Sequence, residues 1–229
     1  DSSENLEEEV LKTSLQNITG NGYNSLGYNT ARDSLFMWFD NKRTNGQGAA
    51  QNTLECVYTG RLAIGYTSRS DCQTNDTFNT EHTFPQSFFS SNEPMKSDLH
   101  HLFPTDDNAN NVRSNYPFGI ATTVSWTQGG SPFDNITNIF EPRDQHKGET
   151  ARAMLYFVMR YQNYSNFLNS QESILKTWNH NFPPSMIEAV RNNNIYLIQN
   201  NRNPFVDYPQ FADRITSFST TSVAPINYS

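Results

Sequence analysis

The sequence predicts an α+β fold, in which a mainly helical body carries one small unit of strand, loop, strand and helix. Apolar residues recur at helical spacing near both ends of the chain, which indicates helices there. The stretch 78–118 has little periodicity and holds three of the five histidines among acidic and amide residues. Because no internal repeat or linker divides the chain, we expect a single domain over 1–229, with its functional core at about 78–118.

The first part of the chain alternates helical and irregular segments. Residues 4–15 have apolar side chains at helical spacing with acids in the first turns, and Gly20 ends this segment. The aromatic stripe over 31–39 predicts the core face of a second helix, with Thr30 as its N-cap. The other elements expected here are a strand over 56–64 that Gly60 interrupts and a loop over 71–79.

The part of the chain after the histidine cluster is dominated by helical patterns. Residues 126–143 are rich in Gly, Pro and Asn, so we expect a loop or short strands there. The strongest helical pattern of the protein covers 149–161. Two further helices are expected at 171–179 and 184–199, where paired prolines mark the start of the second and Pro204 marks its end.

The formal net charge is −7, but most of it lies near the N-terminus, and the rest of the chain is close to neutral. A strongly basic surface that coats nucleic acid is therefore excluded, although a local basic groove remains compatible with this composition. The mean hydropathy of −0.72 and the lack of a long apolar run exclude a transmembrane helix. The N-terminal acids are Asp1, Glu4, Glu7, Glu8 and Glu9.

Cys56 and Cys72 enclose a short polar stretch that a disulfide could close. Such a bond would contribute about 3 kcal/mol, and we expect it, with two buried free thiols as the alternative. The sequence opens with an acidic, polar segment and not with a signal peptide, so either processing has removed one or the protein stays inside the cell. The expected disulfide favours export, and we expect a secreted or periplasmic protein.

The three histidines of the stretch 78–118 are His82, His100 and His101, and the first of them follows Glu81 directly. Histidine next to a carboxylate suggests general-base or metal chemistry. In a zinc site the histidines would be ligands, but the His-x-x-x-His and cysteine pairs typical of zinc are absent from the sequence. In a magnesium site the ligands are a few oxygens, which Glu81 and a downstream Asn or Asp could supply, and the histidine is then free to act on water.

Strand geometry restricts how these residues can meet. Glu81 and His82 point to opposite faces of a regular strand, so they serve one site only if the strand ends or kinks there, and Pro85 favours an end. Asp98 and His100 would share one face of a second strand. The residues 104–107 predict a helix start, with Thr105 or Asp106 as the cap and Asn110 about one turn into the helix.

At this point the residues match a known family. The segment resembles the bacterial endonuclease I family, the periplasmic and secreted nonspecific nucleases with a ββα-metal, or His-Me finger, site. Weaker similarity extends from the string Tyr28–Arg32 to the string Asn203–Asp207, so the resemblance covers most of the chain. The matching pieces are Glu81-His82, Asp98-Leu99-His100, Pro104 followed by Asn110, and Arg113-Ser114-Asn115.

The resemblance implies a role for each matching residue. His82 would be the general base that deprotonates water, and Glu81 and Asn110 would hold one Mg²⁺, for which Ca²⁺ or Mn²⁺ can substitute. Some members carry a catalytic arginine in the loop after the Glu-His pair, whereas here Lys96 is the only cation between His82 and Asp98. Arg113 is then the candidate catalytic cation that contacts phosphate, and an ion pair that holds the finger helix is the alternative.

The remaining candidates have weaker roles. We expect Asp98 and His100 to orient the site and satisfy buried polar groups, without binding the metal. His101 is left open between a groove residue and a packed one, whereas His146 and His180 are expected at the surface.

The predicted function is that of an endonuclease that cleaves DNA, and also RNA, without sequence preference. The resemblance implies 5′-phosphate and 3′-hydroxyl ends, and we expect a monomer with nucleic acid as its partner and no membrane contact. The competing interpretation is a noncatalytic secreted module that binds carbohydrate or a surface, suggested by the many Asn, Tyr and Trp residues. A zinc-dependent hydrolase of another substrate is a third interpretation.

Overall fold

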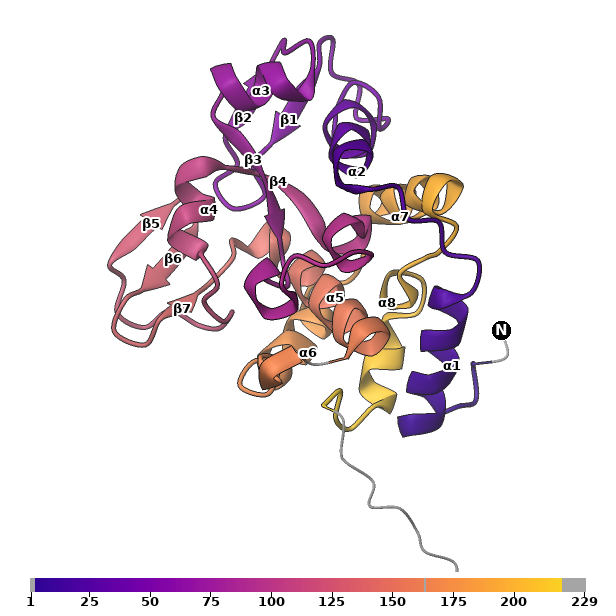
Figure 1. Ribbon diagram of the computed structural model, residues 1–229. Helices are drawn as coiled ribbons and strands as arrows, with labels where there is room; N and C mark the ends of the chain where they lie inside the picture. The colour runs from indigo at the N-terminus through magenta and orange to yellow at the C-terminus, as the bar shows by residue number, and fades with distance from the viewer. Residues whose placement is uncertain (1–2, 163, 220–229) are drawn as a thin grey trace, which may run out of the picture.

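The computed structural model describes residues 3–162 and 164–219, and it has the α+β architecture that the sequence predicts (Figure 1). It consists of helices and small antiparallel sheets, which turns and irregular segments connect. The longer helices are α1 (Glu8–Gly20), α5 (Asp144–Tyr161), α6 (Glu172–Asn181) and α7 (Met186–Gln199). The shorter helices are α2 (Tyr28–Ser34), α3 (Arg69–Asn75), α4 (Asp107–Arg113) and α8 (Pro204–Asp207).

Helix α5 is the centre of the helical body. All of its residues from Thr150 to Arg160 are buried, as expected for a helix that is packed on every side. Helices α1, α6 and α8 pack against it, and Figure 1 shows it in orange between α1 and the sheets. The ring of Phe157 stacks on Phe84 with centroids 4.1 Å apart, so the segment that follows the site strand is fixed to this core.

All strands of the described residues pair antiparallel. A hairpin joins β1 and β2, a ribbon joins β3 and β4, and the other three strands form a sheet of their own beside α4 (Figure 1). The strands are β1 (Thr53–Glu55), β2 (Leu62–Ile64), β3 (Phe78–His82), β4 (Leu102–Asp106), β5 (Trp126–Gln128), β6 (Ser131–Asp134) and β7 (Ile139–Phe140).

The ribbon of β3 and β4 continues into α4 and confirms the predicted unit of strand, loop, strand and helix. His82 is the last residue of β3, as the position of Pro85 indicated, and it pairs with Leu102. Strand β4 runs directly into α4, where the Asp106 side chain accepts a hydrogen bond of 2.8 Å from the Ala109 N–H. Asp106 is therefore the predicted cap, and it fixes where the first turn of α4 begins.

The expected second strand around Asp98 and His100 is wrong. Asp98 lies before a single 3₁₀ turn, Leu99–His101, and β4 begins only after this turn. The Asp98 side chain accepts a hydrogen bond of 3.1 Å from the His100 N–H, and this local bond competes with an extended ladder. The two side chains thus do not share a strand face.

Some boundaries in the first part of the chain also differ from the prediction. The second helix begins at Tyr28 with Gly27 as its N-cap, instead of Thr30, and continues as a π-helical turn over Leu35–Phe39. The expected strand at 56–64 is mostly a turn between β1 and β2, and Gly60 has a positive φ of 72° there. A Cβ atom at Gly60 would also collide with the Arg143 guanidinium.

The expected loop over 71–79 contains instead the larger part of α3, which begins at Arg69, and the start of β3. The Ser68 hydroxyl caps α3 by accepting a hydrogen bond of 3.1 Å from the Asp71 N–H. A seven-residue polar helix has no apolar periodicity, so the capping residue was its only signal. In this segment the hydrogen bond from the Asp71 N–H to the Ser68 hydroxyl marks the start of the helix.

The predicted helices of the second part are confirmed, with small shifts. Helix α5 begins five residues before the expected start at 149, and the short strands β5 to β7 lie within the expected segment 126–143. Helix α7 ends at Gln199, as predicted, and Pro204 begins the following helix α8. Proline is favoured at the first helical position because it lacks the N–H that remains unpaired there.

The expected disulfide is wrong, because Cys56 and Cys72 are both buried free thiols. The Cys56 sulfur faces the junction of β4 and α4, where it accepts a hydrogen bond of 3.2 Å from the Asp106 N–H. Cys72 lies on the buried face of α3, and burial raises the pKa of its thiol to about 12. Among the described helices, none has the length and apolar character that crossing a membrane requires.

Candidate active site

A pocket of about 360 Å³ lies at the end of β3 and along α4. Glu81 and His82 line it from β3, and Asn110 lines it from α4, so the structure brings the three predicted residues to one pocket. The remaining lining side chains are uncharged: Thr80, Pro85, Gln86, Ser87, Asn111, Ser114 and Asn115.

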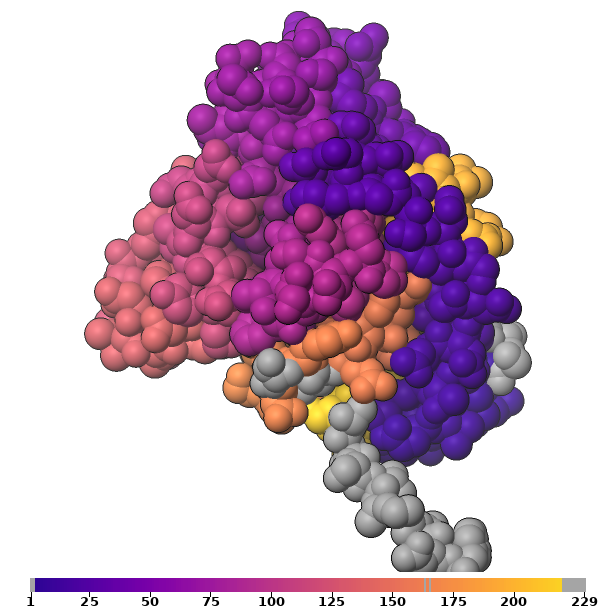
Figure 2. Space-filling view, in the orientation of Figure 1, coloured from indigo at the N-terminus to yellow at the C-terminus, as the bar shows by residue number. Residues whose placement is uncertain are grey.

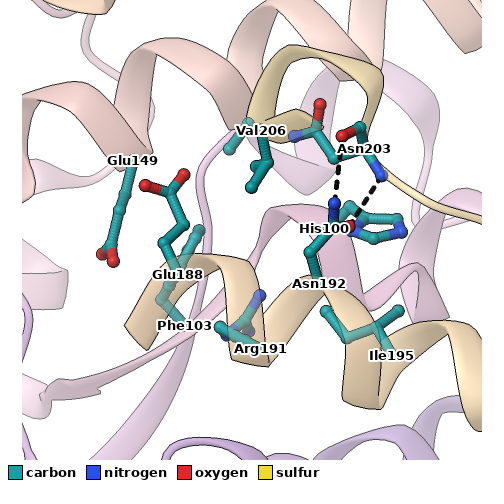
Figure 3. Close-up of a pocket in the computed structure, with 10 residues that line it drawn as sticks. His100, Phe103, Glu149, Glu188, Arg191, Asn192, Ile195, Asn203 and Val206 are labelled. Carbon is teal, nitrogen blue, oxygen red and sulfur yellow. Dashed lines mark hydrogen bonds between the residues drawn. The ribbon is translucent and has the colours of Figure 1, made fainter. Parts of the chain in front are cut away.

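A second, much smaller cavity lies between β4, α5 and α7 (Figure 3). Its volume is about 20 Å³, which is room for one water molecule. His100 lines this cavity, and Figure 3 shows the two hydrogen bonds that join Asn192 to Asn203 at its edge. Such a cavity is too small for a substrate. Among the larger pockets of the described residues, the one at the end of β3 is the candidate site because Glu81, His82 and Asn110 all line it.

The His82 ring is held in one orientation at the side of the pocket. Its Nε2 lies 3.0 Å from the Lys96 carbonyl oxygen, and a carbonyl can only accept, so Nε2 carries the proton. Nδ1 is then the basic nitrogen of the neutral ring. Burial lowers the pKa of His82 well below 6.5, and the neighbouring His101 adds to this effect. The imidazole is therefore neutral at pH 7, with Nδ1 unprotonated.

Glu81 has its two carboxylate oxygens in different surroundings. Oε1 accepts a hydrogen bond of 2.8 Å from the Tyr58 hydroxyl and lies 3.0 Å from Nε of Arg113. Within the described residues, Oε2 accepts no hydrogen bond and has no ion pair. Burial raises the pKa of Glu81, and the Arg113 charge and the Tyr58 hydrogen bond act against it. One oxygen is thus held in place and the other is left for a ligand.

Asn110 occupies the second turn of α4 and is half-buried. Its side-chain amide forms no hydrogen bond to any other described residue, although it lines the pocket. An amide oxygen and a free carboxylate oxygen are hard ligands of the type that Mg²⁺ prefers. The donor set of Glu81 and Asn110 therefore fits a Mg²⁺ ion that keeps several waters.

Arg113 has no exposed surface from which to contact a phosphate. Besides Glu81, its guanidinium reaches the carbonyl oxygens of Thr83 at 2.6 Å and Ser114 at 2.7 Å. These contacts tie the end of α4 to the end of β3. The geometry corrects the choice of Arg113 as the phosphate-binding cation in favour of the alternative, an ion pair that holds the finger helix.

Asp98 and His100 lie outside the pocket and are buried in the body. The Asp98 carboxylate accepts hydrogen bonds from the hydroxyls of Tyr156 at 2.8 Å and Tyr161 at 2.7 Å, and from Gln199 at 2.8 Å. Both residues therefore satisfy buried polar groups at a distance from the pocket, and neither lines it.

The other histidines divide between packing and surface. His101 is packed, with its ring 5.4 Å from that of His82 and its Nε2 bonded to the Met95 carbonyl. His180 is exposed, as predicted. His146 was expected at the surface but is 1% exposed, because its ring packs against aromatic side chains and its Nδ1 lies 2.8 Å from Glu149.

Sequence reasoning missed Tyr58 and Tyr28. Tyr58 is fully buried behind Glu81, and Tyr28 places its ring 5.4 Å from that of His82. Neither tyrosine lies near the histidine cluster in the sequence. The match of the string Tyr28–Arg32 to the family pattern was the one signal that pointed to this segment.

Comparison with known families agrees with this geometry, because a family model described as Endonuclease I matches residues 7–210. The chain belongs to the endonuclease I family. Membership supports hydrolysis of nucleic acid, and the predicted resemblance is thus confirmed.

Curated relatives of this endonuclease I protein are named as nucleases. The chain is 30% identical over 226 residues to an extracellular ribonuclease of Bacillus subtilis (strain 168), a match that covers 90% of this chain and 73% of the relative. An extracellular ribonuclease of Bacillus amyloliquefaciens is also 30% identical, with the same coverage of 90% and 73%. A periplasmic deoxyribonuclease of Aeromonas hydrophila is 26% identical, over 49% of this chain and 48% of the relative. These names support a secreted or periplasmic location.

The zinc interpretation finds no support in the described part of this endonuclease I protein. No group of three or more His, Cys, Asp or Glu side chains is placed there to hold a metal ion. A structural or catalytic zinc site needs at least three such ligands. The oxygen pair of Glu81 and Asn110 suits the magnesium interpretation instead.

Proposed function

We propose that this protein is a nonspecific endonuclease that hydrolyses phosphodiester bonds of DNA and RNA, with His82 as general base and one Mg²⁺ at Glu81 and Asn110. The observation that carries the proposal is the single pocket that all three side chains line. Relatives named as a ribonuclease and as deoxyribonucleases support both kinds of nucleic acid as substrates. The protein would act as a monomer outside the cytoplasm and leave 5′-phosphate and 3′-hydroxyl ends.

His82 acts on the attacking water. Because the Lys96 carbonyl holds the Nε2 proton, Nδ1 takes the proton of a water molecule that attacks phosphorus in line. The lowered pKa of His82 keeps the ring neutral before this step at neutral pH. The ring contact with Tyr28 and the hydrogen bond to the Lys96 carbonyl keep the orientation of the imidazole.

Glu81 and Asn110 are the residues that would hold the metal. Oε2 of Glu81 is free for this role, because Tyr58 and Arg113 contact Oε1. When bound, Mg²⁺ supplies positive charge for the phosphoryl oxygens and the leaving 3′-oxygen. The buried Arg113 stays at the carboxylate and fixes its position, so the cation that binds substrate phosphate must lie elsewhere.

A plasmid-nicking assay with Mg²⁺ or with EDTA tests the function, and two variants separate the roles. In His82→Ala the rate should fall by about 10²–10⁴-fold, the usual contribution of a general base, while metal binding persists. In Glu81→Ala both the rate and metal binding should be lost. Mn²⁺ binding, measured by electron paramagnetic resonance, gives the second readout.

His180→Ala is the matched control, because this histidine is exposed and lies outside the pocket. It should nick plasmid at the wild-type rate. The proposal fails if the wild-type protein cleaves nucleic acid as fast in excess EDTA as it does with Mg²⁺. It also fails if His82→Ala retains near-normal nicking.

A further inference from the structure

Most of the 16 Lys and Arg side chains are neutralised by a carboxylate within 4.0 Å. Within the described residues, the exceptions are Arg32, Arg43, Lys96 and Arg214. Two of these exceptions, Arg32 and Lys96, meet at one side chain next to the pocket. Cations without a carboxylate partner are the ones available for substrate phosphates.

The meeting point is the ring of Tyr28. The guanidinium carbon of Arg32 lies 4.2 Å from the ring centroid, and the ammonium nitrogen of Lys96 lies 4.8 Å from it. Arg32 reaches the ring because residues four apart share one face of α2. The same ring lies 5.4 Å from that of His82. We call Tyr28, Arg32 and Lys96 the Tyr28 cluster.

The acidic residues closest in sequence to this cluster are engaged elsewhere. Asp33 pairs with Arg69 at 2.6 Å, and the Glu93 carboxylate accepts a hydrogen bond of 2.5 Å from Ser97. Arg32 donates to Asn29, but its buried Nε has no hydrogen-bond partner. Burial lowers the pKa of Arg32 and nearby Arg69 adds to this effect, whereas Tyr28 and Asp33 act against it. No carboxylate lies within 4.0 Å of Arg32 among the described residues, because Asp33 is paired with Arg69.

The cluster lies at the edge of the active site. Lys96 supplies both the carbonyl that bonds to His82 and the ammonium at the Tyr28 ring, so the position of one residue links the general base to the cluster. Helix α2 packs against the 3₁₀ turn Met95–Ser97 that carries Lys96. In Figure 2 the indigo surface of the segment with α2 adjoins the magenta surface of the segment around residues 85–100.

The pocket itself is lined only by Glu81, His82 and uncharged side chains. A polynucleotide with one phosphate in this pocket extends beyond it. Its neighbouring phosphates would then contact side chains at the edge of the pocket. Two like charges at one ring repel each other, and a phosphate that contacts both would relieve this repulsion.

We propose that Arg32 and Lys96 bind a substrate phosphate that neighbours the scissile one, with Tyr28 holding both cations beside the general base. The proposal rests on the proposed nuclease function and names the surface by which that site holds a chain of nucleotides. It fits single-stranded DNA or RNA, where phosphate contacts provide affinity without reading the sequence.

Arg32→Gln and Lys96→Gln test the proposal with a single-stranded oligonucleotide as substrate. Each variant should raise KM about tenfold, the lower end of what a charge-assisted hydrogen bond contributes, with kcat nearly unchanged. The slope of log(kcat/KM) against log[salt] should become shallower by about 0.7 for each contact removed. On bis(p-nitrophenyl) phosphate, which has a single phosphodiester, the same variants should lose far less. Lys96→Arg should retain most of the oligonucleotide activity.

Arg43→Gln is the matched control, because Arg43 also lacks a carboxylate partner but is exposed and lies outside the pocket. It should leave KM and the salt slope unchanged. The proposal is overturned if both test variants keep the wild-type KM and slope, or if kcat falls equally on the oligonucleotide and on bis(p-nitrophenyl) phosphate.

Oligonucleotide binding in EDTA, followed by fluorescence anisotropy, separates this proposal from the nuclease function. Weaker binding and a shallower salt slope in both test variants support the Tyr28 cluster even if the wild-type protein does not cleave. Equal binding by wild type and both variants overturns the cluster even if the wild-type protein is an active nuclease.

Discussion

Glu81 and His82 are adjacent residues whose side chains have very different surroundings. Glu81 faces a tyrosine hydroxyl and a buried guanidinium, whereas His82 lies among aromatic rings and one backbone carbonyl. The first environment fixes a carboxylate oxygen, and the second keeps an imidazole neutral. Two residues at the end of one strand can therefore take separate roles in one pocket.

Removal of the Tyr58 hydroxyl tests whether the surroundings of Glu81 hold its carboxylate in place for a metal ion. In Tyr58→Phe the Glu81 carboxylate loses the hydrogen bond of 2.8 Å and keeps only the Arg113 contact. Partners of this kind affect metal affinity or activity by about 10–100-fold. We therefore expect the Mg²⁺ concentration for half-maximal nicking to rise about tenfold, as measured by titration of Mg²⁺ in the nicking assay.

Tyr66→Phe provides the control for the loss of a buried hydroxyl. Tyr66 donates to the Phe36 carbonyl and lies outside the pocket, so its removal should affect stability and leave the Mg²⁺ requirement unchanged. Equal Mg²⁺ requirements for Tyr58→Phe and wild type would contradict the role given to Tyr58.

The sequence predicts those site residues that lie close to one another along the chain. Glu81, His82 and Asn110 lie on adjoining pieces of one ββα unit, so their order and spacing place them together. Tyr58 meets Glu81 only because the turn after β1 folds back over the ribbon, which no local pattern encodes. The buried pairing of Arg113 also depends on tertiary contacts, and the sequence left it as one of two interpretations.

At the scale of elements, Asp98 joins three of them. It precedes the turn Leu99–His101, accepts hydrogen bonds from tyrosines at the end of α5, and bonds to Gln199 at the end of α7. Burial alone would raise the pKa of Asp98, but Arg160, at 3.7 Å, and the other polar neighbours lower it overall. The charged form of Asp98 therefore stabilises the packing of these elements.

Asp98→Asn should lower the free energy of unfolding by about 3 kcal/mol at pH 7, because it leaves the buried Arg160 without its anion. The folded pKa lies below the unfolded value of about 3.9, so the contribution of Asp98 is present above that value and is lost as the pH falls through the folded pKa. The difference between variant and wild type should therefore shrink below about pH 4. Urea unfolding between pH 3 and pH 7 measures it.

Asp144→Asn is the comparison for an exposed ion pair, and it should change the unfolding free energy by less than about 1 kcal/mol. A constant difference between Asp98→Asn and wild type over the whole pH range would contradict the assignment of the effect to the charge of Asp98.

Whether an element could be predicted depended on the kind of signal that it carries. Helices α5, α6 and α7 pack an apolar face or are apolar on most sides, so their periodicity located them within a few residues. The turn Leu99–His101 and helix α3 depend on single hydrogen bonds from Asp98 and Ser68, and alternation of residue types suggested a strand or a loop instead. Capping residues outweigh periodicity in segments this short.

At the scale of the whole molecule, charge pairing leaves little free positive surface. The formal net charge is −7, and most Lys and Arg side chains lie next to a carboxylate. We expect cleavage to depend less steeply on salt than that of a strongly basic DNA-binding protein, with a slope of log(kcat/KM) against log[salt] no steeper than about −3, the value for roughly three or four phosphate contacts. Nicking rates between 20 and about 300 mM NaCl at fixed Mg²⁺ provide the measurement. A slope near that of a strongly basic DNA-binding protein would contradict this expectation.

Composition excludes a strongly basic surface that coats nucleic acid, whereas the order of residues in the ββα unit predicts a site that acts on it. The family match supports the second argument, because a site can be built by a few residues while the net charge describes the surface average. The extent of the domain over 1–229 stays a prediction.

The two unbonded cysteines have a consequence for how the protein can be made. Their sulfurs are shielded from solvent, and the raised pKa of Cys72 keeps that thiol protonated at neutral pH. No covalent cross-link has to form or be reshuffled before the chain acquires its native arrangement. The enzyme can therefore mature without an oxidant or a disulfide isomerase, and a reducing buffer is as suitable for its preparation as an oxidising one.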